Sequence, residues 1–457
     1  MALPFGLDRF LRRDPTPLNV RRFEGAGGGR RAFDLGTMGR MGTETALAGP
    51  TLRARARFRA ANDPFIANAV GNMVASMVGA GIMPTPQHPD PETRKAQSAV
   101  WGEFCDMADA DGRTDLYGIQ SEGARCVAVD GEAFLQLIDG PDGPRVRLIP
   151  PELVDESLTR DLGGGRFIVS GVEFNADMTR AAYWVLPARP TDTFATTGTP
   201  VRIPADEILH VFKPLGPGQV RGVSWLAPVI LAAAELDKLV DALVMGAQVA
   251  AMFAGFVVNQ NAVGGDDPFG GEAQPSLEPG TLQRLAGGWD VKFATPAQVA
   301  QVEPILKHGL RQLAAGLGLP SHLLDGDLSD ANYSSLRAGL LPFRQRMEQV
   351  QYHTLVPQLL NPLWARVIAW AVTSGRMEAP DYEANPRAYR AEWLPPAWPQ
   401  VDPLKDTQAT VAEINAGLTS RRKAVAQRGW ALDDLDAELA AEGWQRPGTT
   451  TEGGENA

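Results

Sequence analysis

The stretch from Leu310 to Glu348 constrains the fold more than any other, because it reads as a helix, a polar loop and a second helix. Apolar residues recur at helical spacing until Pro320, which cannot continue a helix. The loop that follows is rich in aspartate between 325 and 332. A second helix is predicted to open at Ser334 or Ser335, either of which can cap it. The pattern predicts two helices that offer a polar loop to another molecule.

Composition places the chain among folded proteins with two to four structural units, since its 457 residues are 44% hydrophobic and 21% charged. The net charge of −11 argues against a coat that wraps phosphates, but it is compatible with a surface past which DNA slides. Residues 1–60 hold twelve arginines against five acids, whereas 431–457 hold seven acids against Arg446 alone. Such ends suit contacts with other subunits, or simple solvation.

Cysteine use and apolar runs indicate where the protein folds. Cys105 and Cys126 form no C-x-x-C motif and suggest no disulfide framework, which is typical of a reducing cytoplasm. The most membrane-like run, 242–258, is shorter than the roughly 20 residues that a span needs. We expect a buried or interface helix there and no membrane partner, with membrane insertion as the alternative.

Signatures of catalysis and of metal binding are absent from the sequence. None of the five histidines has ligand spacing, and no P-loop or nucleophile elbow is present. Asp325, Asp327 and Asp330 resemble a calcium loop, but the required glycine and distal glutamate are missing. We therefore expect no enzyme, no metal and no cofactor. An α/β enzyme with an unrecognised site remains an alternative.

Periodicity predicts a mixed helical and β-rich chain. A Gly- and Arg-rich segment, 1–50, is predicted to be a flexible basic arm. Helices are predicted at about 62–78, 91–107, 114–130, 224–253 and 296–317. Strands are predicted at 131–138, 145–149, 167–169, 172–174, 181–186 and 208–212, and we expect them to form one antiparallel sheet. Pro304 is expected to kink the helix that contains it or to mark its true start.

Six motifs in one order carry a resemblance that covers roughly residues 45–445. They are LRARARFRAA at 52–61, VDGEAF at 129–134, GVEF at 171–174, the segment from His210 to Pro228, Asn332 to Gly339, and the helical region 402–442. In this order they resemble the lambda-type portal proteins of tailed bacteriophages. The resemblance implies an α+β portal fold and a ring, typically of twelve subunits, at one capsid vertex.

The resemblance also implies how the chain is divided. The expected parts are a flexible arm (1–50), an α/β wing (51–223), a first stem helix (224–256), a clip (257–295), a second stem helix (296–317), a tunnel loop (318–334), wing and tunnel helices (335–399), a crown (400–445) and an acidic disordered tail (446–457). The implied function is a channel through which double-stranded DNA is packaged and ejected. Another head–tail or capsid assembly protein that is not the channel is the alternative.

Site residues follow from the same plan. The tunnel-loop candidates are Leu319, Ser321, His322, Asp325, Asp327, Ser329, Asp330 and Asn332. Lys307 and Arg311 lie four apart on one helix face, which is either solvated or turned towards DNA or a neighbouring subunit. Arg337, Arg344, Arg346 and Glu348 are candidates for intersubunit pairing, and Asp266, Asp267, Phe269, Glu278 and Trp289 for terminase docking at the clip.

The implied partners are further copies of the chain in a dodecamer, DNA without sequence preference, the terminase large subunit, a head–tail adaptor, and the major capsid and scaffolding proteins. The expected location is the virion, at the capsid portal vertex, after assembly in the host bacterial cytoplasm.

Overall fold

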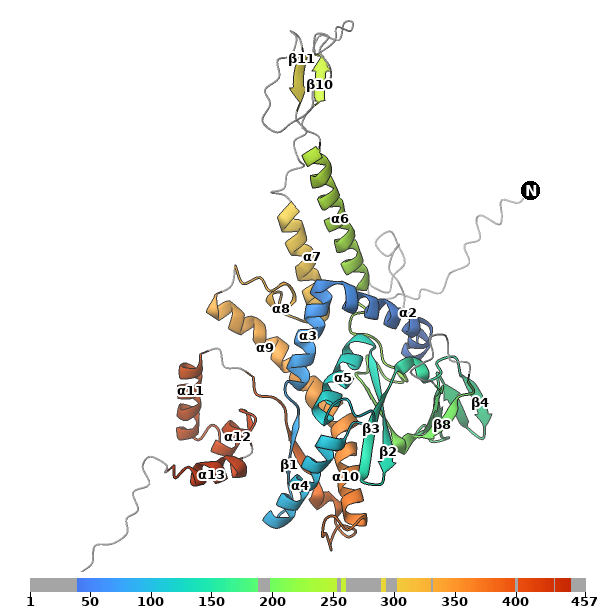
Figure 1. Ribbon diagram of the computed structural model, residues 1–457, viewed down its shortest axis with the longest axis vertical. Helices are drawn as coiled ribbons and strands as arrows, with labels where there is room; N and C mark the ends of the chain where they lie inside the picture. The colour runs from blue at the N-terminus through green and yellow to red at the C-terminus, as the bar shows by residue number, and fades with distance from the viewer. Residues whose placement is uncertain are drawn as a thin grey trace, which may run out of the picture.

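A computed structural model describes residues 39–187, 198–252, 256–259, 289–292, 302–329, 332–398, 402–430 and 432–444. Its body contains helices and two sheets, and a pair of helices, α6 and α7, projects from the body as a stalk (Figure 1). Three C-terminal helices lie to one side of the body. The mixed α+β class expected from the sequence is confirmed.

Four helices form the N-terminal part of the body. Aspartates cap three of them, because Asp63, Asp90 and Asp115 each accept hydrogen bonds from backbone amides of the first turn. The helix that Asp90 caps, 91–107, has the bounds predicted from the sequence. The four are α2 (Met41–Asn62), α3 (Pro64–Val78), α4 (Pro91–Met107) and α5 (Leu116–Val129).

The first helix begins earlier than expected. Residues 41–50, predicted to belong to a flexible arm, are helical, and α2 continues through Pro50. The hydroxyl of Thr45 donates to the carbonyl of Met41 at 2.7 Å and closes the first turn. Arginines further along the helix are paired within the body, as described below. Tertiary contacts therefore outweigh the local glycine and proline signals. Residues 1–38 of the predicted arm, and the predicted tail from residue 446 onward, lie outside the described residues.

The strands between residues 132 and 212 form two sheets, so the expectation of a single sheet is wrong. One sheet has the order β3-β2-β9, from β2 (Glu132–Gly140), β3 (Gly143–Ile149) and β9 (Ile208–Phe212). The other has the order β4-β5-β6-β7-β8, from β4 (Arg160–Gly163), β5 (Arg166–Val169), β6 (Val172–Phe174), β7 (Arg180–Val185) and β8 (Val201–Pro204). All their strand pairs are antiparallel.

The physical reason for two sheets is a turn between β8 and β9. A short 3-10 helix, Ala205–Glu207, redirects the chain, so that β9 pairs with β2 instead of extending the second sheet. The two sheets then share a small second core, in which Phe134, Val172 and Tyr183 are buried together. Such a choice between pairing partners depends on long-range packing, which the alternation within one strand does not encode.

The stalk consists of α6 (Ile230–Met252) and α7 (Val302–Leu317). The first of these helices was predicted from 224, but Pro228 precedes it and the residues before Ile230 form turns. Pro304 lies in the first turn of α7, where its missing N–H costs little. Beyond the stalk, β10 (Phe256–Asn259) pairs antiparallel with β11 (Trp289–Lys292). Among the described residues, no helix has the length and apolar content to cross a membrane.

A short helix, α8 (His322–Asp325), lies within the predicted loop and is fixed to α3. The side-chain amide of Asn68 donates to the carbonyl of Leu324 at 2.8 Å, and that of Asn72 donates to the carbonyl of Leu323 at 2.7 Å. Leu324 is itself buried in the main core. The base of the loop is therefore held by the body of the protein.

The helix after the loop, α9 (Tyr333–Val350), is capped by Asn332 and not by Ser334 or Ser335. The Asn332 side chain accepts from the Ser335 amide, and the Ser335 hydroxyl accepts from the Asn332 amide. This reciprocal capping box satisfies two amides that a helix end leaves open. The chain continues through a π-helix, Gln351–Leu360, into α10 (Asn361–Thr373).

The C-terminal region contains a strand that the sequence did not predict, because its proline-rich surroundings resemble a linker. This strand, β12 (Ala391–Leu394), pairs with β1 (Met83–Pro86), with Trp393 opposite Pro84. Three C-terminal helices follow, within the region 402–442 that was expected to be helical. They are α11 (Pro403–Asn415), α12 (Arg421–Ala426) and α13 (Leu432–Ala441).

A buried carboxylate, Glu132 at the start of β2, joins several of these elements. It accepts hydrogen bonds from Arg53 of α2 at 3.0 Å, His210 of β9 at 3.0 Å, Arg221 at 2.9 Å and the amide of Gly222 at 2.8 Å. Its side chain is 0% exposed. We call these five residues the Glu132 cluster.

Arg221 extends the cluster to the loop that leads into the second sheet. Its guanidinium donates to the carbonyls of Pro151 and Ser170, both at 2.9 Å. Glu156 accepts from Arg221 at 3.1 Å and from Arg53 at 2.6 Å. The two buried cations thus have carboxylate and carbonyl partners, which burial of charge requires.

The protonation states in the cluster follow from these contacts. Burial alone would raise the pKa of Glu132, but the charge of Arg221 and the hydrogen bond from His210 hold that pKa well below its usual range. Burial lowers the pKa of His210 to about 4, even though its bond to Glu132 opposes this. His210 is therefore neutral at pH 7. Its Nε2–H donates to Glu132, and its Nδ1 accepts from Arg180 at 3.2 Å.

Replacing Arg221 by Met should lower the free energy of unfolding by about 3 kcal/mol, because it leaves part of a buried carboxylate charge unbalanced. Equilibrium urea unfolding measures this change. Arg366→Met is the matched control, since Arg366 pairs with the exposed Asp139 and its loss should cost less than about 1 kcal/mol. Equal losses in the two variants would contradict the structural role of the Glu132 cluster.

His210 should make the protein less stable as the pH falls below about 6.5. Its pKa is lower in the folded than in the unfolded chain, so the unfolded state binds the extra proton first and stability drops down to about pH 4. Between pH 7 and 4.5 the loss should be on the order of 2 kcal/mol. His210→Gln retains a donor and an acceptor and should flatten this part of the urea-unfolding profile. An unchanged slope would exclude His210 as its origin.

Replacing Asn68 and Asn72 by Ala should release α8 from α3, because about 1 kcal/mol is lost with each hydrogen bond. Hydrogen–deuterium exchange of the segment 318–329 should become faster, while the rest of α3 stays protected. Asn62→Ala is the control, since the Asn62 side chain bonds only within its own helix, to the carbonyl of Phe58. Unchanged exchange in 318–329 would mean that other contacts hold the loop.

Candidate functional site

A polar hollow of about 370 Å³ lies where α7, the α8 segment and α9 meet. It combines residues predicted separately for the stem and for the loop. Its walls are Lys307 and Arg311 of α7, Pro320, Ser321, His322, Asp325 and Asp327 of the loop, and Ser335, Leu336 and Gly339 of α9. The fold therefore brings two cations of α7 and two carboxylates of the loop to one surface.

The cations of the hollow are not equivalent. Lys307 forms an ion pair with Glu303, one turn earlier in α7, at 3.1 Å. Arg311 is exposed and has no ion-pair partner among the described residues. Burial lowers the pKa of His322, although Asp325 opposes the shift, so this imidazole adds no charge at pH 7. The cationic wall consists of Lys307 and Arg311.

The carboxylates are held by turns of the loop. The Asp325 carboxylate accepts from the amide of Asp327 at 3.0 Å, and the Asp327 carboxylate accepts from the amide of Ser329 at 2.9 Å. Gly326 between them has a φ of +72°, a left-handed conformation that favours glycine. Hydrogen bonds from Ser329, with a smaller contribution from the charge of Lys307, lower the pKa of Asp327. Asp327 therefore stays ionised at neutral pH.

Other predicted loop residues have different environments. Leu319 is buried in the main core, so it supports the loop and we no longer propose it as a contact. Ser329 is exposed, and Asn332 caps α9. Asp330 lies outside the described residues. No group of His, Cys, Asp or Glu that could hold a metal ion occurs within the described residues.

The four predicted intersubunit residues all have neighbours within their own chain. Arg337 pairs with Asp406 of α11 at 3.4 Å, and the guanidinium of Arg344 lies 5.3 Å from the ring centre of Trp398. Glu348 accepts from the indole N–H of that tryptophan at 3.2 Å. A Cβ on Gly318 would overlap the guanidinium of Arg346, which therefore lies against the start of the loop. Intersubunit pairing by these residues stays a prediction.

Most clip candidates cannot be placed. Asp266, Asp267, Phe269 and Glu278 lie outside the described residues. Trp289 begins β11, and its backbone register places it opposite Asn259. A role of these residues in docking stays a prediction.

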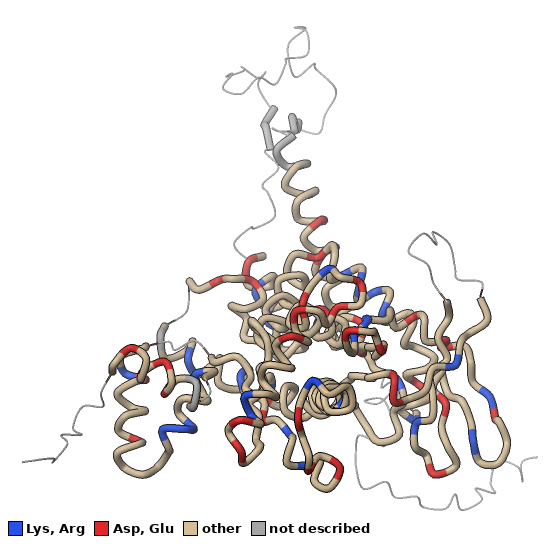
Figure 2. The backbone as a smooth tube through the Cα atoms, turned by 60° about the horizontal axis from the view of Figure 1, so that its bottom comes forward, with Lys and Arg blue, Asp and Glu red and all other residues tan. Residues whose placement is uncertain are grey.

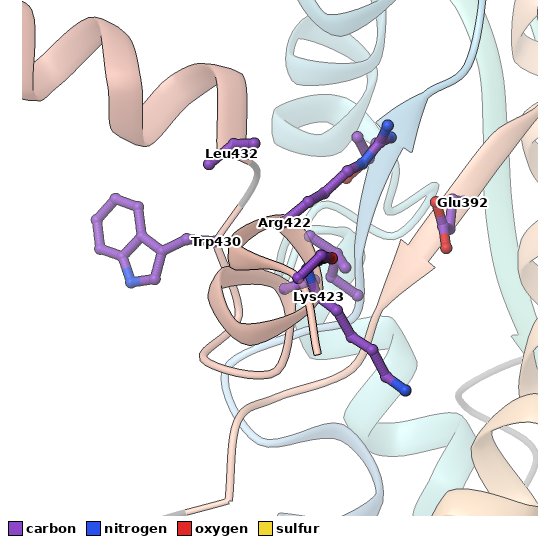
Figure 3. Close-up of a pocket in the computed structure, with 9 residues that line it drawn as sticks. Glu392, Arg422, Lys423, Trp430 and Leu432 are labelled. Atoms are coloured by element: carbon purple, nitrogen blue, oxygen red, sulfur yellow. Dashed lines mark hydrogen bonds between the residues drawn. The ribbon is translucent and has the colours of Figure 1, made fainter. Parts of the chain in front are cut away.

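A second hollow, which the sequence did not indicate, lies between the β1–β12 ribbon and the C-terminal helices (Figure 3). Arg422 and Lys423 of α12 and Glu392 of β12 line it, while the half-exposed Trp430 projects away from the ribbon. The only sequence signal for this hollow was the basic run 421–423. It follows Ser420, whose side chain caps α12. Elsewhere, basic and acidic positions alternate over the described body (Figure 2).

Comparison with solved structures finds distant similarity. The neck of an empty GTA particle has a TM-score of 0.46 and 16% identity, over 85% of this chain and 94% of that chain. An HK97 family phage portal protein from Corynebacterium diphtheriae has a TM-score of 0.34 and 13% identity, over 77% of this chain and 96% of that chain.

Comparison with known sequences is more informative. A probable portal protein of Halomonas phage phiHAP-1 is 26% identical over 328 residues, which are 69% of this chain and 63% of that protein. The chain thus spans less than two thirds of that relative's length. Portal protein B of Escherichia phage lambda is 25% identical over 394 residues, which are 76% of this chain and 73% of that protein.

The family model for phage portal proteins of the lambda family matches residues 31–351, well over half of the 457 residues. The match includes α7, the loop and α9, from which the candidate surface is built. The chain belongs to the lambda family of phage portal proteins.

Proposed function

We propose that copies of this chain form a ring at one capsid vertex and that double-stranded DNA passes through the ring during packaging and ejection. The observation that carries the proposal is the loop after α8, whose base is fixed to the body by Asn68 and Asn72 while its polar part faces Lys307 and Arg311. A fixed base and an ionic surface without a sequence-reading element suit contact with a moving duplex.

We propose that the chain has the parts that the resemblance implied. We infer that 51–223 is the wing, that 224–256 and 296–317 are the stem, that 257–295 is the clip and that 318–334 is the tunnel loop. Residues 335–399 then complete the wing and tunnel, and 400–445 form the crown. The end of the stalk is the natural place for the terminase large subunit and a head–tail adaptor, with the clip as their docking part. We propose the virion as the location of the ring.

The stalk also supports a ring because its apolar surface is only partly covered. Val244 and Met245 on α6 are 50% and 59% exposed, and Ile305 on α7 is 57% exposed. Large exposed side chains gathered on two projecting helices are typical of an interface. We propose that the stalks of neighbouring copies cover them, in a heterologous contact that closes into a ring of about twelve subunits.

The purified chain should assemble into rings with a central hole wide enough for a DNA duplex, as measured by mass photometry and negative-stain imaging. Val244→Glu combined with Met245→Glu should shift the mass distribution towards monomers, because it buries charges between subunits. Met178→Glu is the control, since Met178 is 68% exposed at a turn between β6 and β7. Assemblies without a hole, or equal assembly of both variants, would contradict the proposal.

A further inference from the structure

We propose that Asp325 and Asp327 act as built-in competitors of the DNA phosphates for Lys307 and Arg311, and so keep the grip of this surface on DNA weak. The inference rests on the proposed function, because it concerns how the same surface treats the duplex. It assigns the two carboxylates a role of their own. In this role they limit affinity, and they neither read the DNA sequence nor bind a metal.

The four charged side chains line one hollow of about 370 Å³, with the cations on α7 and the carboxylates on the loop beside it. The space between them is open and polar. A phosphate that approaches Arg311 or Lys307 therefore enters the field of two fixed negative charges. These charges repel the phosphate and attract the same cations, so they weaken the ionic contact that the phosphate can make.

The carboxylates are preorganised by contacts within the loop and with α3. Backbone amides of the loop bind Asp325 and Asp327, and Asn68 and Asn72 fix the short helix that ends at Asp325. The carboxylates consequently cannot swing far away when DNA arrives. Glu303 adds a further negative charge beside Lys307. The surface thus holds three carboxylates against two cations, although it contains an exposed guanidinium.

The charge of these aspartates can be separated from their role in the turn. Each carboxylate uses one oxygen to accept a backbone amide, and the side-chain carbonyl of asparagine can accept the same hydrogen bond. Asp161 makes an equivalent bond to the amide of Gly163, at 2.8 Å, on the exposed β4–β5 hairpin. The turn therefore does not require a charge. A change from Asp to Asn removes the competitor and retains the loop.

Weak phosphate contacts matter for a channel because the contacts of all subunits add up around a ring. Each cation that fully neutralises a phosphate releases counterions and strengthens binding at low salt. One unopposed arginine in each of about twelve subunits would hold the duplex and resist its movement. Carboxylates beside each cation preserve a weak attraction that guides the DNA without retaining it.

The test measures the affinity of the full-length assembled chain for a short duplex by fluorescence anisotropy over a range of salt concentrations. Asp325→Asn with Asp327→Asn should tighten binding about three- to tenfold near 0.1 M salt. The slope of log K against log salt should become steeper by about 0.9 for each newly engaged phosphate. Asp161→Asn, the matched control, should change neither quantity. Mass photometry of every variant verifies that assembly is unchanged.

Lys307→Gln with Arg311→Gln should weaken binding, and in this background the two Asp→Asn changes should have little further effect. If the Asp→Asn variant binds like the wild type while Lys307→Gln with Arg311→Gln weakens binding, the competition is refuted but the DNA surface stands. If all variants bind alike, this surface does not contact DNA, and the loop as carrier of the proposed function fails too. If Asp161→Asn tightens binding equally, the effect is one of net charge and the inference is wrong.

Discussion

Burial of the Glu132 carboxylate is the constraint on which much of the structure depends. A fully buried charge must be matched by donors in fixed positions, and here α2, β9 and the segment before α6 supply them. Gly131 and Gly222 permit this arrangement, since a Cβ on either would overlap the backbone of the other segment. The cluster therefore fixes where the first sheet ends and where the chain turns towards the stalk.

From this cluster a continuous path leads to the candidate surface. Arg53 places α2 against the cluster, and further along the same helix Arg59 pairs with Asp237 of α6. The cap at Asp63 joins α2 to α3, whose Asn72 holds the base of the loop. The loop and the stalk are thus positioned by one rigid set of helices. If the surface contacts DNA as proposed, this support keeps the loop from following the moving duplex.

The sequence predicts those parts of the structure that depend on neighbouring residues. Sequence reasoning recognised the family, several helices and strands with their bounds, and the loop with its cations. It described the motifs around Glu132 and Arg221 only as marks of resemblance, because nothing local says that residues 89 positions apart form a buried ion pair. The same limit explains the error of one sheet instead of two. The hollow was likewise not predicted, since the attachment of α8 to α3 is a contact between residues more than 250 positions apart.

The two ionic groups of this protein illustrate opposite uses of charge. In the Glu132 cluster, burial makes each pairing strong, so the charges specify one arrangement of the chain and exclude others. At the loop, solvent weakens each contact, and cations share their surroundings with carboxylates in fixed turns. The net charge of −11 fits the second use better than a basic surface would. A chain that both holds its own shape and lets a polyanion pass needs strong pairing inside and balanced charge at its surface.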